Sequence, residues 1–371
     1  MPSEPAEPRS RLTGSRALDA LLPAGAVAIA LAFAHAPALW PFLFAALGLI
    51  PAAALLGRAT EELAARLGPL SAGLVQATLG NASELILGIV ALHAGLVEVV
   101  KASLAGSIIS NLLLILGMSM LLGGMHRTRQ RIDRDLARTN ATTLFLAAVG
   151  LIVPAVFALS IYGDLATNRP AIESMSEWTA GILIVIYVAS LRYQFDSSPR
   201  GRRPRRRVAG PRRGPLAAMA AVTAYIAVLS ELLVRGLESA QQAFHGTDLF
   251  WGGVVFAIIG NAAEHAVAVS AARRDDMDMA MAIGVGSSLQ IALLLAPALV
   301  FISLAFGHPM SLVFTGIEVV AVVLSAVLVG MIASDGETNW FEGAQLLAVY
   351  AILVVGFYFA PLLARVVSTS R

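Results

Sequence analysis

The chain has 371 residues, of which 57% are hydrophobic and only 13% are charged. Soluble domains carry about 25% charged residues, so this composition excludes an ordinary soluble domain and predicts an integral membrane protein. The chain contains no cysteine, which excludes disulfides and thiolate metal sites, and its net charge of +2 is less informative than the distribution of the charges.

Eleven apolar runs follow one another along the chain, and each approaches the roughly 20 residues that a membrane-spanning helix needs. They cover residues 20–36, 38–57, 71–92, 102–123, 140–160, 178–195, 215–235, 250–271, 279–305, 310–332 and 343–363. The predicted fold class is therefore an all-α integral membrane protein with 11 transmembrane helices. Residues 1–19 form a polar tail, although a signal peptide cleaved near Ala32–Ala34 is an alternative interpretation.

The basic residues predict an orientation, because cytoplasmic segments of membrane proteins carry an excess of lysine and arginine. If the N-terminus is cytoplasmic, the inner segments hold 21 of the 26 basic residues. An odd number of helices then places the C-terminus outside. The longest connection, residues 196–214, is an arginine-rich cytoplasmic linker, for which contact with anionic lipid is the alternative to a simple solvated loop.

Two short motifs each occur twice in the chain, and one common shift along the sequence superimposes both pairs. GNASE at Gly80–Glu84 corresponds to GNAAE at Gly260–Glu264, and GSIISNLLLIL from Gly106 corresponds to GSSLQIALLLA from Gly286. We call this shift of 180 residues the repeat offset, and we call two residues that it superimposes repeat mates. Two motifs in one register indicate an internal repeat rather than chance.

The two copies of the motif lie on the third and eighth predicted helices, so an odd number of helices separates them and they cross the membrane in opposite directions. The sequence predicts one extra helix at residues 20–36, a first five-helix repeat at 38–195 and an inverted second repeat at 215–363, joined by the linker at 196–214. Inverted repeats are typical of secondary transporters, whose ion sites lie near the midplane where the repeats meet.

Each motif carries one acid, Glu84 or Glu264, near the centre of a membrane helix. A charge there costs at least about 2.5 kcal/mol, which indicates a function. Asn81 and Asn261 precede the acids by three residues and share their helix faces. Because a glycine before each asparagine weakens the helix, we expect both helices to be interrupted there, and their crossing to gather carboxylate and neutral oxygens.

An all-oxygen site suits Ca²⁺, which takes about 6–8 oxygen ligands, whereas Zn²⁺ and copper favour cysteine or histidine. Two carboxylates balance one divalent cation. Without the cation, burial and mutual repulsion favour protonation of such a pair. The motif chemistry therefore predicts exchange of one divalent cation for about two protons.

The paired motifs resemble the signature repeats of the cation/proton exchanger family, Ca²⁺/H⁺ antiporters within the cation/Ca²⁺ exchanger superfamily. TEELAARLGP at Thr60–Pro69 is similar to the run before the first motif, and SDGETNWFEG at Ser334–Gly343 to the loop before the last helix. The resemblance covers residues 60–343. It implies an eleven-helix antiporter that moves Ca²⁺ out of the cytosol against entering protons, without a cofactor.

The resemblance also implies roles for individual residues. Six would be ligands of the transported metal ion: Glu84, Glu264, Asn81, Asn261, Ser110 and Gln290. Three acids are similar to residues that serve proton access or cytosolic gating: Glu61, Glu62 and Glu231. Family members often carry an acidic segment between the repeats, and the arginine-rich linker at 196–214 departs from that pattern.

Structural interpretations stand beside these roles. His265 follows Glu264 and has the chemistry to pass or sense protons, but a packing role is equally open. As alternatives to the ligand and gating roles, the two asparagines would cap helix ends and Ser110 would bond a carbonyl of its own helix. The three gating acids would simply be solvated at helix ends.

The predicted function is a Ca²⁺/H⁺ antiporter working by alternating access, with Ca²⁺, protons and lipid as partners, no nucleic acid, and a bacterial inner membrane as its location; a homo-oligomer is left open. The alternative is a Na⁺/Ca²⁺ exchanger, or an exchanger of other monovalent or divalent cations such as K⁺ or Mn²⁺, of the same superfamily. Such a protein would be expected to carry a further carboxylate where this chain has Ser110 or Gln290. A cation channel or an intramembrane enzyme is more remote. No HExxH or GxSxG motif occurs, so we do not expect an enzyme.

Overall fold

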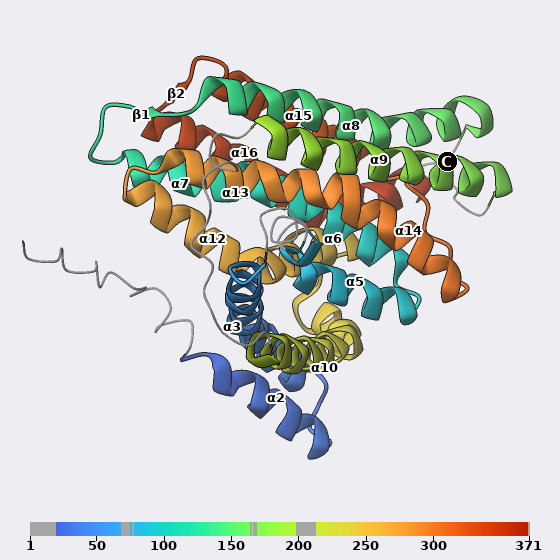
Figure 1. Ribbon diagram of the computed structural model, residues 1–371. Coiled ribbons are helices and arrows are strands. Elements are labelled where there is room, and N and C mark those ends of the chain that lie inside the picture. Colours follow the sequence, from blue (N-terminus) through green and yellow to red (C-terminus); the bar gives the residue numbers. More distant parts are fainter. Residues whose placement is uncertain are drawn as a thin grey trace, which may run out of the picture.

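The computed structural model describes residues 20–67, 75, 78–163, 165, 169–197 and 213–369, and within them the protein is almost entirely helical (Figure 1). The tail predicted at residues 1–19 and most of the linker predicted at 196–214 lie outside the described residues.

Nine helical spans in the described part of the chain are long and apolar enough to cross a membrane, and two shorter apolar helices complete the eleven predicted runs. Eight spans are single helices: α2 (Leu22–Phe33), α3 (Leu39–Ala64), α5 (Ala82–His93), α8 (Arg134–Tyr162), α9 (Pro170–Ser197), α10 (Arg213–Phe244), α15 (Gly316–Ala333) and α16 (Trp340–Thr369). Three spans contain a π-helical turn: α6 (Val97–Ile109), η1 (Ser110–Ile115) and α7 (Leu116–Gly124); α11 (Asp248–Phe250), η2 (Trp251–Phe256) and α12 (Ala257–Arg273); α13 (Met277–Gln290), η3 (Ile291–Leu295) and α14 (Ala296–Ala305).

Several helices extend beyond their predicted apolar runs. α10 continues to Phe244 although the run ends at residue 235, and α9 begins at Pro170 rather than at 178. The added turns carry polar residues such as Glu173 and Gln242. A helix can extend past the apolar layer of a bilayer, so hydropathy marks the membrane-buried part better than the helix ends.

The repeat is visible in the backbone as well as in the sequence. The turn between α5 and α6 places Gly95 in the left-handed region at φ +77°, and its repeat mate Asp275 occupies the same place between α12 and α13 at φ +67°. The π-helical turns η1 and η3 begin at Ser110 and Ile291, within one residue of the repeat offset. The correspondence therefore extends well beyond the two short motifs.

The two composite spans that follow the repeated motifs lie at the centre of the molecule. In the span Val97–Gly124, 83% of the most apolar window is buried, compared with 22% in Pro170–Tyr193 of α9. Figure 1 shows α3 and α10 side by side with α2, whereas α8, α9 and α15 lie across the molecule from them. Helices α5 and α12, which carry the repeated motifs, thus connect this three-helix group to the central spans.

The helix ends define two faces of the molecule. The loops at residues 125–133, 274–276 and 334–339 meet at one end, which we call the Arg127 face. There β1 (Gln130–Arg131) pairs antiparallel with β2 (Glu337–Thr338), and Arg127 forms an ion pair with Asp275 at 3.3 Å. The turns at 94–96, 245–247 and 306–315 form the opposite end, which we call the His93 face.

Close backbone packing joins the repeats near the centre. A Cβ atom at Gly106 in α6 would overlap the carbonyl oxygen of Gly253 in η2. The repeat mate of Gly106 is Gly286, where a Cβ atom would meet nothing within 4 Å. Only the first of these two glycines is therefore required by its surroundings.

We predict that Gly106→Ala lowers thermal stability, because overpacking typically costs about 1–3 kcal/mol. Gly286→Ala should be neutral or stabilising by up to about 1 kcal/mol, since alanine favours helix. Melting of the two purified variants, followed by size-exclusion chromatography after heating, compares them directly. Equal melting temperatures would contradict the proposed difference in packing.

Candidate functional site

Glu84 lies where the third span is interrupted. Residues 78–79 are helical, Gly80 and Asn81 form a turn, and α5 begins at Ala82, so Glu84 is in the first turn of a new helix. The Ser83 hydroxyl donates to Glu84 Oε2 at 2.9 Å, and the residue is only 8% exposed. The positive end of the α5 dipole favours an anion at this position.

Glu264 lies in the interior of α12, and its surroundings are different. Ser287 in α13 lies beside its carboxylate, and Glu84 lies close enough for the two acids to repel each other. The Glu84 side chain packs on Gly260, one helical turn before Glu264 in α12. Glu264 Oε2 is buried without a hydrogen-bond partner. The structure therefore brings the two predicted acids together from opposite repeats.

The predicted interruption of the second motif helix is wrong. Asn261 lies within continuous α12, and the irregular segment is the π-helical turn η2, which ends one residue before α12 begins. Asn261 Nδ2 donates to the carbonyl of Ala257 at 2.8 Å, a bond to the preceding turn that an intact helix allows. Gly260 serves close packing instead, because a Cβ atom there would lie 3.3 Å from Glu84 Cγ.

The two motif asparagines connect the repeats through their amide nitrogens. Asn81 Nδ2 donates to Gln290 Oε1 at 2.9 Å, and Asn261 Nδ2 donates to Ser107 Oγ at 3.0 Å. Both amide oxygens, Asn81 Oδ1 and Asn261 Oδ1, remain buried without a partner. Buried polar atoms are nearly always hydrogen-bonded. These two oxygens and Glu264 Oε2 are therefore available as ligands for a cation.

Two neighbouring residues on the central span differ in their partners. Ser110 is fully buried and donates to the carbonyl of Ser107 at 3.2 Å, a bond within its own helix. Asn111 is also fully buried, but neither polar atom of its side chain has a hydrogen-bond partner. Asn111 was not among the residues predicted from the sequence, although an amide directly before the run LLLIL was a detectable signal.

The predicted gating residues do not join the carboxylate pair as one cluster. Glu62 pairs with Arg66 in the turn that follows α3, Glu231 pairs with Arg235 within α10, and Glu61 is exposed. His265 is half-buried, and its Nε2 atom has no hydrogen-bond partner. Within the described residues, no three His, Asp or Glu side chains gather as a metal cluster, so any cage must combine the two acids with neutral oxygens.

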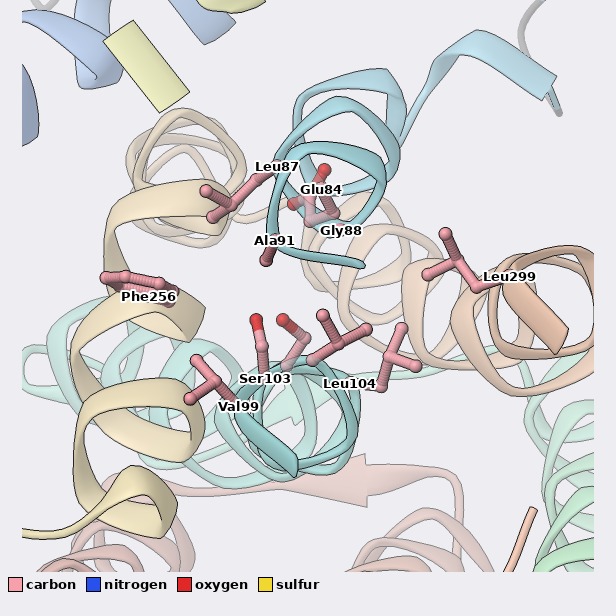
Figure 2. Close-up of a pocket in the computed structure, with 11 residues that line it drawn as sticks. Glu84, Leu87, Gly88, Ala91, Val99, Ser103, Leu104, Phe256 and Leu299 are labelled. Carbon is pink, nitrogen blue, oxygen red and sulfur yellow. The ribbon is translucent and has the colours of Figure 1, made fainter. Parts of the chain in front are cut away.

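A pocket reaches Glu84 from one side (Figure 2). Apart from the acid, its lining is mainly apolar, with Ser103 and Ser107 as the polar side chains. The other lining residues come from α5, α6, η2 and α14: Leu87, Gly88, Ala91, Val99, Val100, Leu104, Phe256 and Leu299. All of these lie on the parts of their helices between the acid and the His93 face, so the pocket extends toward that face.

Comparison with known proteins gives consistent matches over most of the chain. The family described as sodium/calcium exchanger protein matches residues 37–195 and 215–359. A Synechocystis protein named Ca²⁺/H⁺ antiporter is 41% identical over 343 residues, which cover 87% of this chain and 91% of that protein. The Bacillus subtilis protein named Ca²⁺/H⁺ antiporter ChaA is 39% identical, covering 87% of this chain and 93% of ChaA. The solved structure of YfkE has a TM-score of 0.80 at 37% identity, covering 92% of this chain and 99% of YfkE.

We predict that Gly260→Ala weakens Ca²⁺ binding, because the added methyl group must displace the Glu84 side chain that packs on this glycine. An affinity loss of about tenfold corresponds to about 1.4 kcal/mol, within the range of overpacking. Gly286→Ala is the matched control, since its Cβ atom has free space. Calorimetric Ca²⁺ titration of both variants measures the effect, and an unchanged affinity in Gly260→Ala would contradict it.

Proposed function

Because the chain belongs to the sodium/calcium exchanger protein family, we propose that Glu84 and Glu264 form the site at which it exchanges Ca²⁺ for protons. The protein is a multi-pass membrane antiporter, and relatives at 41% and 39% identity are named Ca²⁺/H⁺ antiporters. The observation that carries the site assignment is the packing of Glu84 on Gly260 of the opposite repeat, one helical turn from Glu264, beside acceptor oxygens that have no partner.

Ca²⁺ would be held by the carboxylates of Glu84 and Glu264 and by the free amide oxygens of Asn81 and Asn261. Oxygen ligands of this kind match the preference of Ca²⁺, and the two carboxylates balance its charge. The amide nitrogens of both asparagines already donate across the repeat boundary, which orients their oxygens before the ion arrives. Gln290 would act by fixing Asn81.

Protons would replace the cation because an empty site leaves two carboxylates repelling each other in a low-dielectric environment. Protonation neutralises both and allows the site to change its accessible face without a bound metal ion. The two occupancies, one Ca²⁺ or protons, exclude each other because they use the same carboxylate oxygens. This mutual exclusion is what couples the two flows.

The arginine distribution supports a cytoplasmic Arg127 face, since the predicted inner segments hold 21 of the 26 basic residues. The pocket at Glu84 then opens toward the outside, where Ca²⁺ would be released and protons would enter. We assign the protein to a bacterial plasma membrane. We also assign it transport rather than enzymatic catalysis, in keeping with the exchangers to which it is similar.

We predict that Glu84→Gln and Glu264→Gln each abolish coupled exchange, because either change leaves one carboxylate to balance a divalent cation. Purified protein in liposomes with an imposed pH gradient and no Na⁺ would be assayed for ⁴⁵Ca²⁺ uptake and internal pH together. Glu238→Gln, a change at an exposed acid of α10, is the control and should transport normally.

Coupled movement that survives in either variant of the acid pair would overturn the site assignment. Ca²⁺ movement without proton movement in the wild type would instead overturn antiport and indicate a channel.

We predict that Gln290→Glu allows Na⁺ to compete with Ca²⁺, because a third carboxylate gives the site enough negative charge for several monovalent ions. Glutamate keeps an acceptor oxygen for Asn81 Nδ2, so the contact across the repeats survives. Inhibition of ⁴⁵Ca²⁺ uptake by Na⁺ would be compared with Gln242→Glu, at an exposed position of α10. Equal inhibition of ⁴⁵Ca²⁺ uptake by Na⁺ in the two variants would contradict the prediction that Gln290 excludes monovalent ions.

A further inference from the structure

The pocket at Glu84 has a repeat-related counterpart in the other half of the molecule. The repeat offset converts Leu87, Ala91 and Ser103 into Val267, Ala271 and Ile283, and the reverse shift converts Leu299 into Ser119. The counterpart residues lie on α12, α13 and α7, between Glu264 and the Arg127 face. An inverted repeat therefore defines a second route, which would approach Glu264 from the opposite side.

The α7 side of that second region is closely packed in the structure, whereas Val267 on α12 is 43% exposed. A Cβ atom at Gly284 would lie 2.8 Å from Leu116 Cδ2, so the fully buried Leu116 side chain packs directly on the glycine. Further toward the Arg127 face, a Cβ atom at Gly123 would lie 2.8 Å from the Ala272 carbonyl oxygen, to which Gln130 also donates at 3.2 Å. α7 is thus closely packed on α12 and α13.

Leu116 has a smaller residue as its repeat mate. That residue is Ala296, at the start of α14, so the pocket at Glu84 lacks a leucine at the equivalent position. The repeat mate of Gly284 is Leu104, which lines that pocket, so the large and the small side chain of this contact exchange helices between the two routes.

Ser119 lies in the packed region without a hydrogen-bond partner. It is fully buried, and its hydroxyl has no partner within the described structure. Leu116 and Gly123 precede and follow it by three and four residues and contact α13 and α12, so Ser119 shares the helix face that meets those helices. A buried hydroxyl without a partner is costly, which calls for an explanation beyond packing.

We infer that Ser119 lines a second ion route, running from the Arg127 face to Glu264 between α7, α12 and α13, which Leu116 closes by packing on Gly284. This inference rests on the proposed alternating access to the acid pair. When the route opens, the Ser119 hydroxyl meets water or the passing ion and gains the partner that it lacks in the closed form.

Each route has one serine hydroxyl in its lining, but the serine lies on a different helix of the repeat in each route. Toward the His93 face, α6 contributes Ser103 and α14 contributes the apolar Leu299. In the second route, α13 contributes Ile283 and α7 contributes Ser119. Each route therefore carries one hydroxyl beyond the serines that surround the acids, enough to help replace part of the water shell of Ca²⁺.

The cysteine-free chain allows a direct test with single cysteines. Ser119→Cys probes the second route, Leu299→Cys probes the pocket, and Thr128→Cys on an exposed loop reports which side of the vesicle the Arg127 face occupies. Liposomes containing each variant would be treated from one side with a membrane-impermeant cationic methanethiosulfonate reagent. The labelling rate would be measured with and without Ca²⁺, and then again with Leu116→Ala added to Ser119→Cys.

We expect Ser119→Cys to react only from the side that labels Thr128→Cys, and Leu299→Cys only from the opposite side. Leu116→Ala should accelerate labelling of Ser119→Cys about tenfold or more, because truncating a buried leucine weakens the closed packing by more than such a shift requires. Leu116→Val serves as a milder second variant, with a smaller acceleration expected.

Labelling of Ser119→Cys from the side opposite to Thr128→Cys would overturn the inference. So would its failure to react from either side, with or without Leu116→Ala, while Leu299→Cys reacts normally. Neither measurement requires transport, so loss of Ca²⁺/H⁺ exchange in the flux assay would count against the proposed function and leave the labelling result to decide on the route.

Discussion

Two carboxylates held close together inside a membrane protein constrain everything around them. Glu84 and Glu264 repel each other, and the low dielectric around them leaves that repulsion poorly screened. The pair is tolerable only with a counter-charge between the acids or with protons bound to them. Exchange of Ca²⁺ for protons follows from this constraint, because each ion relieves the same electrostatic cost and neither can do so while the other is bound.

The fold meets the constraint by bringing small residues to the crossing of the repeats. Gly260 allows the Glu84 side chain to lie against α12, and Gly106 allows α6 to lie against Gly253. Amide groups then connect the repeats, Asn81 to Gln290 and Asn261 to Ser107. These contacts are not symmetric, since the repeat mate of Gln290 is Ser110, which bonds within its own helix. The two repeats thus share a backbone pattern, but their side chains make different hydrogen bonds on the two sides of the site.

Much of this architecture could be predicted from the sequence. The eleven apolar runs correspond to the eleven helical spans found among the described residues, because a membrane helix satisfies its own backbone and needs only apolar length. The common register of the two motifs also predicted which acids would meet. The turn at Gly80–Asn81 was predictable from local propensity, since glycine and asparagine both weaken a helix.

Other features depend on packing that the sequence does not reveal. Gly260–Asn261 has the same local composition as the first motif, yet α12 continues through it and the π-helical turn lies earlier, in η2. The hydrogen-bond partners of the asparagines, the contact of Gly106 with Gly253 and the isolation of Asn111 all arise where distant segments cross. The ligand roles of the six predicted residues remain predictions, since only an ion at the site can test them.

Proton release on Ca²⁺ binding tests the central claim most directly. Calorimetric titration of purified protein with Ca²⁺, repeated in buffers of different ionisation enthalpy, counts the protons displaced per ion bound. The measurement is made at a pH at which both acids are protonated before Ca²⁺ is added. If Glu84 and Glu264 bind either Ca²⁺ or protons, the wild type should then release about two protons per Ca²⁺, because metal ligands must lose their protons. Ca²⁺ binding with no proton release over the whole pH range of folded protein would contradict the account.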